Sequence, residues 1–222
     1  MSQWEEPAPN ELSISNLTCT REDRVLFTQL EYTCCAGAVL QVLGFNGAGK
    51  TTLLHTLAGL MPPASGVIRW RGESIAGNRS YTRSLFYLGH QAPVKPALTV
   101  AENIQWLARL RGQSPSAEEL CSALEQVDLE AYQNTSCGHL SAGQKRRVAL
   151  AQLYLSAAPL WILDEPFTAI DKEGVGRLQQ LLATHASHGG ISVLTSHQPL
   201  RLENLHTLDL AAFQPDEACA YV

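Results

Sequence analysis

The fold is decided by nine residues, GFNGAGKTT, which run from Gly44 to Thr52. Gly44, four further residues and then Gly49-Lys50-Thr51 form the Walker A pattern of a phosphate-binding loop. Glycines let the backbone N–H groups turn inward around phosphate oxygens, and the helix that follows adds the positive end of its dipole. An apolar run at 39–43 precedes the loop and a helical pattern at 52–58 follows it. This strand–loop–helix context favours a nucleotide site over a chance glycine-rich turn.

Each residue of the loop is therefore a candidate ATP contact: Gly44, Phe45, Asn46, Gly47, Ala48, Gly49, Lys50, Thr51 and Thr52. We expect Lys50 to place its charge at the β- and γ-phosphates and to be catalytic. We expect the Thr51 hydroxyl to bind the Mg²⁺ that accompanies ATP.

A second stretch, WILDEPFTAID at 161–171, ends an apolar run in two adjacent carboxylates. Neighbouring acids repel each other, and a metal ion offsets that repulsion. We expect Asp164 to hold Mg²⁺ through a bound water, and Glu165 to be the catalytic base for the water that attacks the γ-phosphate. Alone, such a pair is more often a solvated strand end. The phosphate loop reverses that interpretation.

The apolar runs predict buried parallel strands at 39–43, 160–163 and 191–194, because none alternates with polar residues. Helical patterns lie between them, so we expect an α/β fold with a parallel sheet. Capping boxes Thr99-x-x-Glu102 and Ser116-x-x-Glu119 open two helices, and Asp171 is a candidate cap for a third. We expect one domain at 10–213 with an inserted helical subdomain at about 92–157, a loose leader at 1–9 and a tail at 214–222.

Composition limits the remaining classes of function. The 222 residues are 45% hydrophobic and 17% charged, with a net charge of −5, so a packed domain is expected and a nucleic-acid partner is not. The six cysteines show no C-x-x-C pair, which favours reduced thiols over a metal or haem site. We expect no signal peptide at the acidic N-terminus and no membrane span.

The stretch LSAGQKRR at 140–147 resembles the signature of the ATP-binding cassette family, usually LSGGQ. The signature residues are Leu140, Ser141, Ala142, Gly143 and Gln144. Ser141-x-x-Gln144 is also a capping box, so the helix start is a candidate anion site. The resemblance implies an ATP-bound head-to-tail homodimer, in which this signature contacts the ATP of the other copy. For Lys145, Arg146 and Arg147 we favour a solvated helix face with some pairing to acids.

The same resemblance implies the rest of the architecture: an α/β P-loop NTPase fold of the ATP-binding cassette type, with an N-terminal antiparallel β part. It also implies further site residues, with Asp171 in a D-loop at the dimer seam and His197 as a catalytic switch histidine. Two positions depart from the family pattern. Arg21 stands where an aromatic side chain usually stacks on adenine, and His90, with Gln91 beside it, stands where the Q-loop glutamine is usual.

Within the family, LGHQAPVKPALTVAENI and GGISVLTSHQPL resemble the haem exporter ATP-binding subunits of cytochrome c maturation system I. This resemblance implies an ATP hydrolase docked peripherally on integral membrane subunits, at the cytoplasmic face of a bacterial inner membrane. Hydrolysis would drive haem export or release of a haem-loaded chaperone, and this chain would not itself bind haem. The nearest alternative is the ATPase of another transporter, for lipoprotein release or a small nutrient.

Overall fold

The computed structural model describes residues 10–22 and 24–215, which form two β-sheets and a set of helices. The first sheet is antiparallel, with the order β2-β1-β4-β5. Its strands are β1 (Glu11–Arg21), β2 (Arg24–Cys35), β4 (Ser65–Trp70) and β5 (Glu73–Ser74). Buried residues alternate with exposed or half-buried ones along much of β1, as expected for a strand with one face on the core.

The second sheet is parallel and has the order β6-β7-β8-β3-β9. Its strands are β6 (Leu85–Leu88), β7 (Leu160–Leu163), β8 (Ile191–Thr195), β3 (Val39–Leu43) and β9 (Leu205–Asp209). Strands β7 and β8 are buried at every position, and β3 at all but its last. The continuous apolar runs therefore predicted three of the five strands, β3, β7 and β8, and did not predict β6 and β9.

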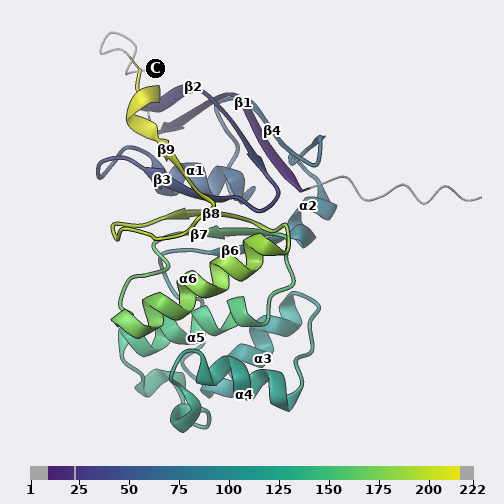
Figure 1. The fold of residues 1–222 in the computed structure, drawn as a ribbon, viewed down its shortest axis with the longest axis vertical. Helices are drawn as coiled ribbons and strands as arrows, with labels where there is room; N and C mark the ends of the chain where they lie inside the picture. The colour runs from purple at the N-terminus through teal and green to yellow at the C-terminus, as the bar shows by residue number, and fades with distance from the viewer. Residues whose placement is uncertain (1–9, 23, 216–222) are drawn as a thin grey trace, which may run out of the picture.

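The two sheets and the helices form layers (Figure 1). Helix α1 (Lys50–Leu57) lies between the sheets, and α6 (Lys172–Ser187) covers the opposite face of the parallel sheet. Adjacent strand residues point to opposite sides, so Leu40 joins the core around α1 while Val39 joins the core beneath α6. The carboxyl ends of the parallel strands meet at one edge, where loops can build a site.

The remaining helices lie mostly on the α6 side. They are α3 (Val100–Leu110), α4 (Ala117–Glu125) and α5 (Ala142–Tyr154), with the short 3₁₀ turns η1 (Glu130–Tyr132) and η2 (Cys137–His139). A short helix α2 (Arg79–Ser84) precedes β6, and the 3₁₀ turn η3 (Leu210–Phe213) follows β9. The capping boxes predicted at Thr99 and Ser116 are both formed, and Asp171 caps α6 by accepting a hydrogen bond from the Gly174 N–H.

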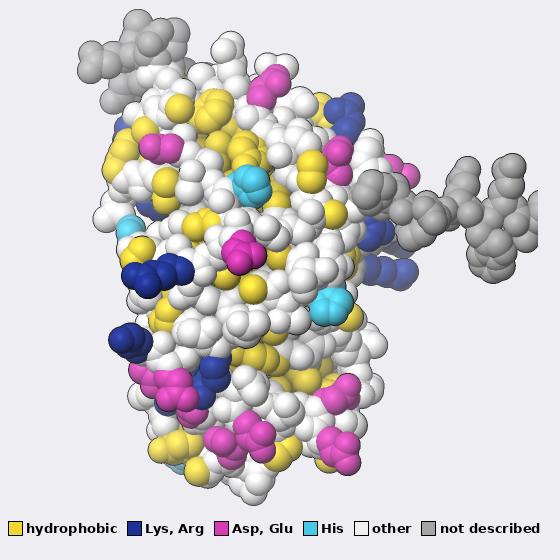
Figure 2. All heavy atoms as spheres, in the orientation of Figure 1, with side chains coloured by type: hydrophobic (Ala, Val, Ile, Leu, Met, Phe, Trp, Pro, Cys, Tyr) yellow, Lys and Arg dark blue, Asp and Glu magenta, His cyan; other side chains and the backbone are white. Residues whose placement is uncertain are grey.

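The surface carries charges of both signs. Figure 2 shows acidic side chains gathered over the lower half of this face, where the helices lie, with basic ones scattered toward its margins. Nucleic-acid binding usually needs a continuous basic face. The basic side chains on the face in Figure 2 are scattered instead. No helix within 10–22 and 24–215 is long and apolar enough to cross a membrane.

The cysteines of the described segments are unbridged. Cys19, Cys34 and Cys137 are buried, whereas Cys35 and Cys121 are exposed. Cys219, the predicted leader at 1–9 and most of the predicted tail lie outside the described residues.

Candidate active site

The phosphate loop joins β3 to α1 in the predicted order. Helix α1 begins at Lys50, two residues earlier than expected, so Lys50 and Thr51 lie in its first turn. Gly49 adopts φ 99°, and a Cβ there would lie 3.1 Å from both Leu26 and Phe27, so only glycine fits. The Lys50 ammonium donates hydrogen bonds to the carbonyls of Gly44 (2.6 Å) and Phe45 (3.2 Å), which holds its charge over the loop.

Asp164 lies at the end of β7 and faces the phosphate loop. Its side chain is 3% exposed and accepts two hydrogen bonds, from the Thr51 hydroxyl (3.0 Å) and from the Thr195 hydroxyl (2.7 Å). Thr195 is the last residue of β8, and the pairing of Leu163 with Leu194 brings it beside Asp164. The carboxylate is therefore fixed between two neighbouring elements.

The Thr51–Asp164 pair fits a hard cation. One hydroxyl and one carboxylate oxygen, 3.0 Å apart, are the ligand types that Mg²⁺ prefers, and Mg²⁺ usually keeps phosphate and water oxygens as its other ligands. The described residues hold no cluster of three or more His, Cys, Asp or Glu side chains suited to a metal. Because Thr51 and Asp164 supply only two oxygens, they suit an ion that arrives with nucleotide phosphates as its other ligands.

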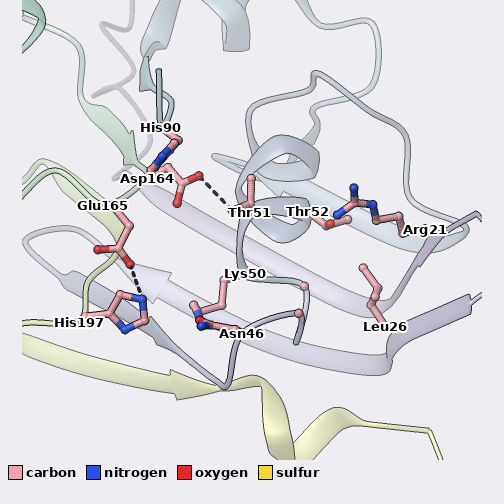
Figure 3. A pocket seen from close by; sticks show the side chains of 12 residues that line it. Arg21, Leu26, Asn46, Lys50, Thr51, Thr52, His90, Asp164, Glu165 and His197 are labelled. Carbon is pink, nitrogen blue, oxygen red and sulfur yellow. Dashed lines mark hydrogen bonds and ion pairs between the residues drawn. The ribbon is translucent and has the colours of Figure 1, made fainter. Parts of the chain in front are cut away.

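Glu165 follows directly and adopts an unusual backbone conformation. Its φ is 49°, in the left-handed region that costs a non-glycine residue about 1–3 kcal/mol unless its surroundings hold it there. The Glu165 N–H donates to the Thr195 hydroxyl at 2.9 Å. The Glu165 carboxylate is 3.5 Å from His197 Nε2, and that histidine is largely exposed (Figure 3).

These groups line one cleft with a volume of about 260 Å³. Figure 3 shows His90, Asp164 and Glu165 on one side of it and Arg21 and Leu26 on the other. The full lining is Arg21, Leu26, Asn46, Gly47, Gly49, Lys50, Thr51, Thr52, His90, Asp164, Glu165 and His197.

The two candidates for the Q-loop residue, His90 and Gln91, lie differently with respect to the cleft. Of the two residues left open by the sequence, His90 lines the cleft, whereas Gln91 is not among the residues that line it. No Phe, Tyr or Trp occurs among the described lining residues. The predicted departures at Arg21 and His90 therefore both face the nucleotide cleft.

The signature residues lie elsewhere. Helix α5 begins directly after Ser141, whose capping box with Gln144 is formed, and Ser141 and Ala142 are exposed. None of Leu140 to Gln144 belongs to the cleft lining. Gly143 lies against the segment before Asp171, since a Cβ on Gly143 would be 3.3 Å from the Ala169 carbonyl. The signature and the predicted D-loop thus form a separate surface.

Arg146 corrects the expectation of a solvated basic face on α5. It is 5% exposed, and its guanidinium donates to the carbonyls of Gly89, His90, Asp164 and Glu165. Burial lowers the pKa of Arg146, and the nearby carboxylates oppose that shift. The expectation failed because the partners are backbone carbonyls, which leave no charge signal in a sequence.

Arg147 fits the expectation of pairing with acids. Its guanidinium lies 3.8 Å from the Asp128 carboxylate and donates to the Val127 carbonyl at 3.2 Å. Arg177 of α6 pairs with the same carboxylate. This cluster joins the helical part to α6, away from the cleft.

The sequence interpretation missed Leu26, which lines the cleft, and it missed Arg146 and Thr195, which form hydrogen bonds with Asp164 and Glu165. Thr195 had a usable signal: it is the hydroxyl residue that ends the third apolar run, and the ends of parallel strands meet at one edge. For Arg146 the sequence carried no signal of burial at the cleft other than its fixed spacing from Ser141.

Comparison with known proteins agrees with this geometry. Residues 27–168 match the sequence profile of the family described as ABC transporter. The chain belongs to the ABC transporter family. As an ATPase of this family it has the expected fold, and the cleft described above holds the family's phosphate loop.

Curated relatives of this ABC ATPase match it over most of their length. It is 47% identical over 208 residues to the cytochrome c biogenesis ATP-binding export protein CcmA of Haemophilus influenzae, covering 93% of this chain and 98% of the relative. The protein of the same name from Saccharophagus degradans is 46% identical, covering 90% and 93%. Among solved structures, a putative ABC transporter ATP-binding protein from Pyrococcus furiosus has a TM-score of 0.81 at 27% identity, covering 92% of this chain and all of that one.

Proposed function

We propose that this ABC ATPase is the ATP-hydrolysing subunit of a membrane export complex for cytochrome c biogenesis. The observation that carries the hydrolytic part is the meeting of Lys50, Thr51, Asp164, Glu165 and His197, from separate elements, in one cleft. The biogenesis part is supported by near-full-length similarity to proteins named for that process. Hydrolysis would drive haem export or release of a haem-loaded chaperone.

Each residue has a proposed role in hydrolysis. Lys50 and the loop N–H groups bind the β- and γ-phosphates, while Thr51 and Asp164 hold Mg²⁺ with ATP. Mg²⁺, when bound, neutralises charge on the phosphate oxygens. Glu165 accepts the proton of the attacking water, and His197, 3.5 Å from Glu165 Oε1, contacts the γ-phosphate. His90 takes the Q-loop position.

The signature supplies the other half of the site. Ser141, Ala142 and Gly143 present the N-terminus of α5 to solvent, where N–H groups and the helix dipole favour an anion. Because the signature does not line the cleft of its own chain, we infer a homodimer in which it contacts the partner's ATP. Asp171 lies beside that seam and caps α6.

The proposed partners are integral membrane subunits, with the ATPase docked at the cytoplasmic face of a bacterial inner membrane. A pull-down of the tagged chain from native membranes, with partners identified by mass, tests this assignment. Membrane proteins of cytochrome c biogenesis should be recovered. Recovery of lipoprotein-release or nutrient-uptake subunits instead would contradict the biogenesis assignment and leave the ATPase assignment standing.

The hydrolytic roles are tested in parallel with Glu165→Gln. This variant should bind ATP normally, because Lys50 and the loop N–H groups that bind the phosphates are unchanged. Its rate of hydrolysis should fall on the order of 10²-fold or more, because the base is removed. It should also fail to support cytochrome c maturation in a strain that lacks the native gene. Near-normal turnover would show that another group is the base.

A further inference from the structure

Arg146 is a buried cation whose hydrogen bonds all end on backbone carbonyls. One terminal nitrogen, Nη1, donates to Gly89 (2.6 Å) and His90 (3.2 Å). The other, Nη2, donates to Asp164 (2.7 Å) and Glu165 (3.0 Å). A planar fork with several donors in fixed directions suits such a set, and a point-charge ammonium does not.

The four carbonyls belong to two neighbouring strand ends. Leu88 of β6 pairs with Leu163 of β7, and the Asp164 N–H donates to the Leu88 carbonyl at 2.7 Å. Immediately beyond this last pair the chain turns out of the sheet on both strands. Arg146 therefore joins the turn that carries His90 to the turn that carries Glu165.

The Glu165 turn needs support from both sides. Its left-handed backbone is held at the N–H by the Thr195 hydroxyl (2.9 Å) and at the carbonyl by Arg146 (3.0 Å) and by the Thr168 N–H (3.2 Å). Without Arg146, the Glu165 carbonyl keeps only the Thr168 N–H as a donor among the described residues, and the residue has more freedom to relax toward an ordinary conformation. The carboxylate would then leave the place where it meets a water on the γ-phosphate.

A packing role alone does not explain a charge here. A buried cation carries a desolvation cost that an apolar side chain of similar volume avoids. The guanidinium also forms no direct pair with a carboxylate among the described residues. Its contacts are instead concentrated on the backbone of the residues that flank the phosphate cleft.

We propose that Arg146 is a positioning residue for ATP hydrolysis, which fixes the Glu165 carboxylate by holding the Glu165 and His90 turns together. This inference rests on the proposed role of Glu165 as the base. Helix α5, which starts at the signature, would then have a second role, because its Arg146 aligns the Glu165 turn of the same chain.

The first test compares Arg146→Lys with Arg147→Lys in the full chain. Lysine keeps the charge of Arg146 and loses the fork, so kcat should fall on the order of 10- to 100-fold with KM for ATP changed by less than about 3-fold. Arg147 is the neighbouring cation on α5 and contacts Val127 and Asp128 away from the cleft, so its variant should stay within about 2-fold of the parent. Equal losses in the two variants, or a parallel rise in KM, would overturn the proposal.

The second test is a double-mutant cycle with Glu165→Gln, measured by single-turnover hydrolysis. If Arg146 acts through Glu165, Arg146→Lys should lower the residual rate of the Glu165→Gln protein by less than about 3-fold. Additive losses would mean that Arg146 acts on something else and would overturn the proposal. Full activity of Glu165→Gln alone would refute the base assignment instead, so the two failures are distinguishable.

Thr195→Val covers the case in which Arg146→Lys does not fold. It removes the hydroxyl that accepts the Glu165 N–H, so it frees the same turn from the other side, and it also removes that hydroxyl's hydrogen bond to the Asp164 carboxylate. The expected result is again a fall in kcat. The part of this fall that comes from the freed Glu165 turn should disappear in the Glu165→Gln background, whereas a part that comes from Asp164 should remain. A folded Thr195→Val protein with the parent kcat would overturn the proposal.

Discussion

Arg21 and Leu26 form the side of the cleft away from Asp164 and Glu165, where the base of a bound nucleotide would lie (Figure 3). A guanidinium plane stacks on a base, as an aromatic ring does, but it offers only hydrogen-bond donors. Both purines present the acceptor N7, but at position 6 adenine carries an amino donor, whereas guanine carries the acceptor O6. Arg21 therefore gives this site no means to prefer adenine.

We predict that the chain hydrolyses GTP with kcat/KM within about 10-fold of that for ATP. Arg21→Ala should raise KM for both nucleotides by about 2- to 5-fold, because an exposed cation–π contact contributes on the order of 0.5–1 kcal/mol. Arg24→Ala, on the same hairpin but outside the cleft lining, is the control and should have no effect. A preference for ATP above about 100-fold would contradict this assignment of Arg21.

At the scale of elements, β7, β8 and α6 are locked together by one histidine. The His185 ring stacks on Trp161 with centroids 3.8 Å apart, and its Nδ1 and Nε2 lie 3.0 Å from the Ser192 hydroxyl and the Ala158 carbonyl. Gly190, directly before β8, leaves room for this ring, because a Cβ there would lie 2.3 Å from His185 Nε2. Burial lowers the pKa of His185 below its usual 6.5, so the folded state favours the neutral ring.

This shift predicts a pH dependence of stability with a definite sign. Below pH 6.5 the unfolded chain takes up a proton at this position that the folded chain resists, so the stabilisation present above pH 6.5 is lost as the pH falls toward the lower, folded-state pKa. Urea midpoints measured from pH 8 to 5.5 should fall less steeply for His185→Phe than for the parent. His206→Gln, which replaces an exposed histidine on β9, is the control.

The same His185→Phe variant has a second expected effect. Phenylalanine keeps the stack on Trp161 but leaves the fully buried Ser192 hydroxyl without its partner, so the protein should be less stable at pH 8 by about 1–3 kcal/mol. If its slope between pH 6.5 and 5.5 equals that of the parent, another group is responsible for the acid sensitivity.

Elements with a local cause were predictable from the sequence. The capping boxes at Thr99, Ser116 and Ser141 depend on residues three apart, and all three are formed. Strands β3 and β7 have the predicted bounds because a strand buried on both faces is apolar throughout. The antiparallel sheet was expected from the family resemblance alone, although the alternation along β1 carries a signal of its own.

Features that depend on distant contacts were not predictable in the same way. At Glu165, whose backbone is left-handed, Thr195 accepts a hydrogen bond from the backbone N–H and Arg146 donates one to the carbonyl, and both lie outside the local segment. The contribution of His90 rather than Gln91 to the cleft follows from how the chain leaves β6. Tertiary packing determines such features, and the identity of a single residue does not predict it.

At the scale of the whole molecule, the phosphate cleft and the signature surface are separate faces of one chain. We predict that the Glu165→Gln protein is monomeric without nucleotide and dimeric with Mg·ATP, because each bound ATP would bridge two copies. Light scattering with and without Mg·ATP measures this change. A stable dimer without nucleotide would contradict it.

Ser141 offers a matched pair of variants for the same prediction. Aspartate and asparagine are both good N-caps, so helix α5 should form in either variant. Ser141→Asp adds a negative charge that repels the partner's phosphates, whereas Ser141→Asn does not. In the Glu165→Gln background the asparagine variant should dimerise with ATP and the aspartate variant should not. Equal dimerisation of the two would place the signature outside the nucleotide site.

A catalytic site divided between two copies changes the order of the reaction. When the chain is dilute, encounters between copies limit turnover, so the rate per molecule should rise in proportion to total concentration. A membrane partner that docks two copies replaces those encounters with an effective concentration that reaches the millimolar range for short flexible links. Release from the membrane would then silence the enzyme by dilution, with no inhibitory segment required.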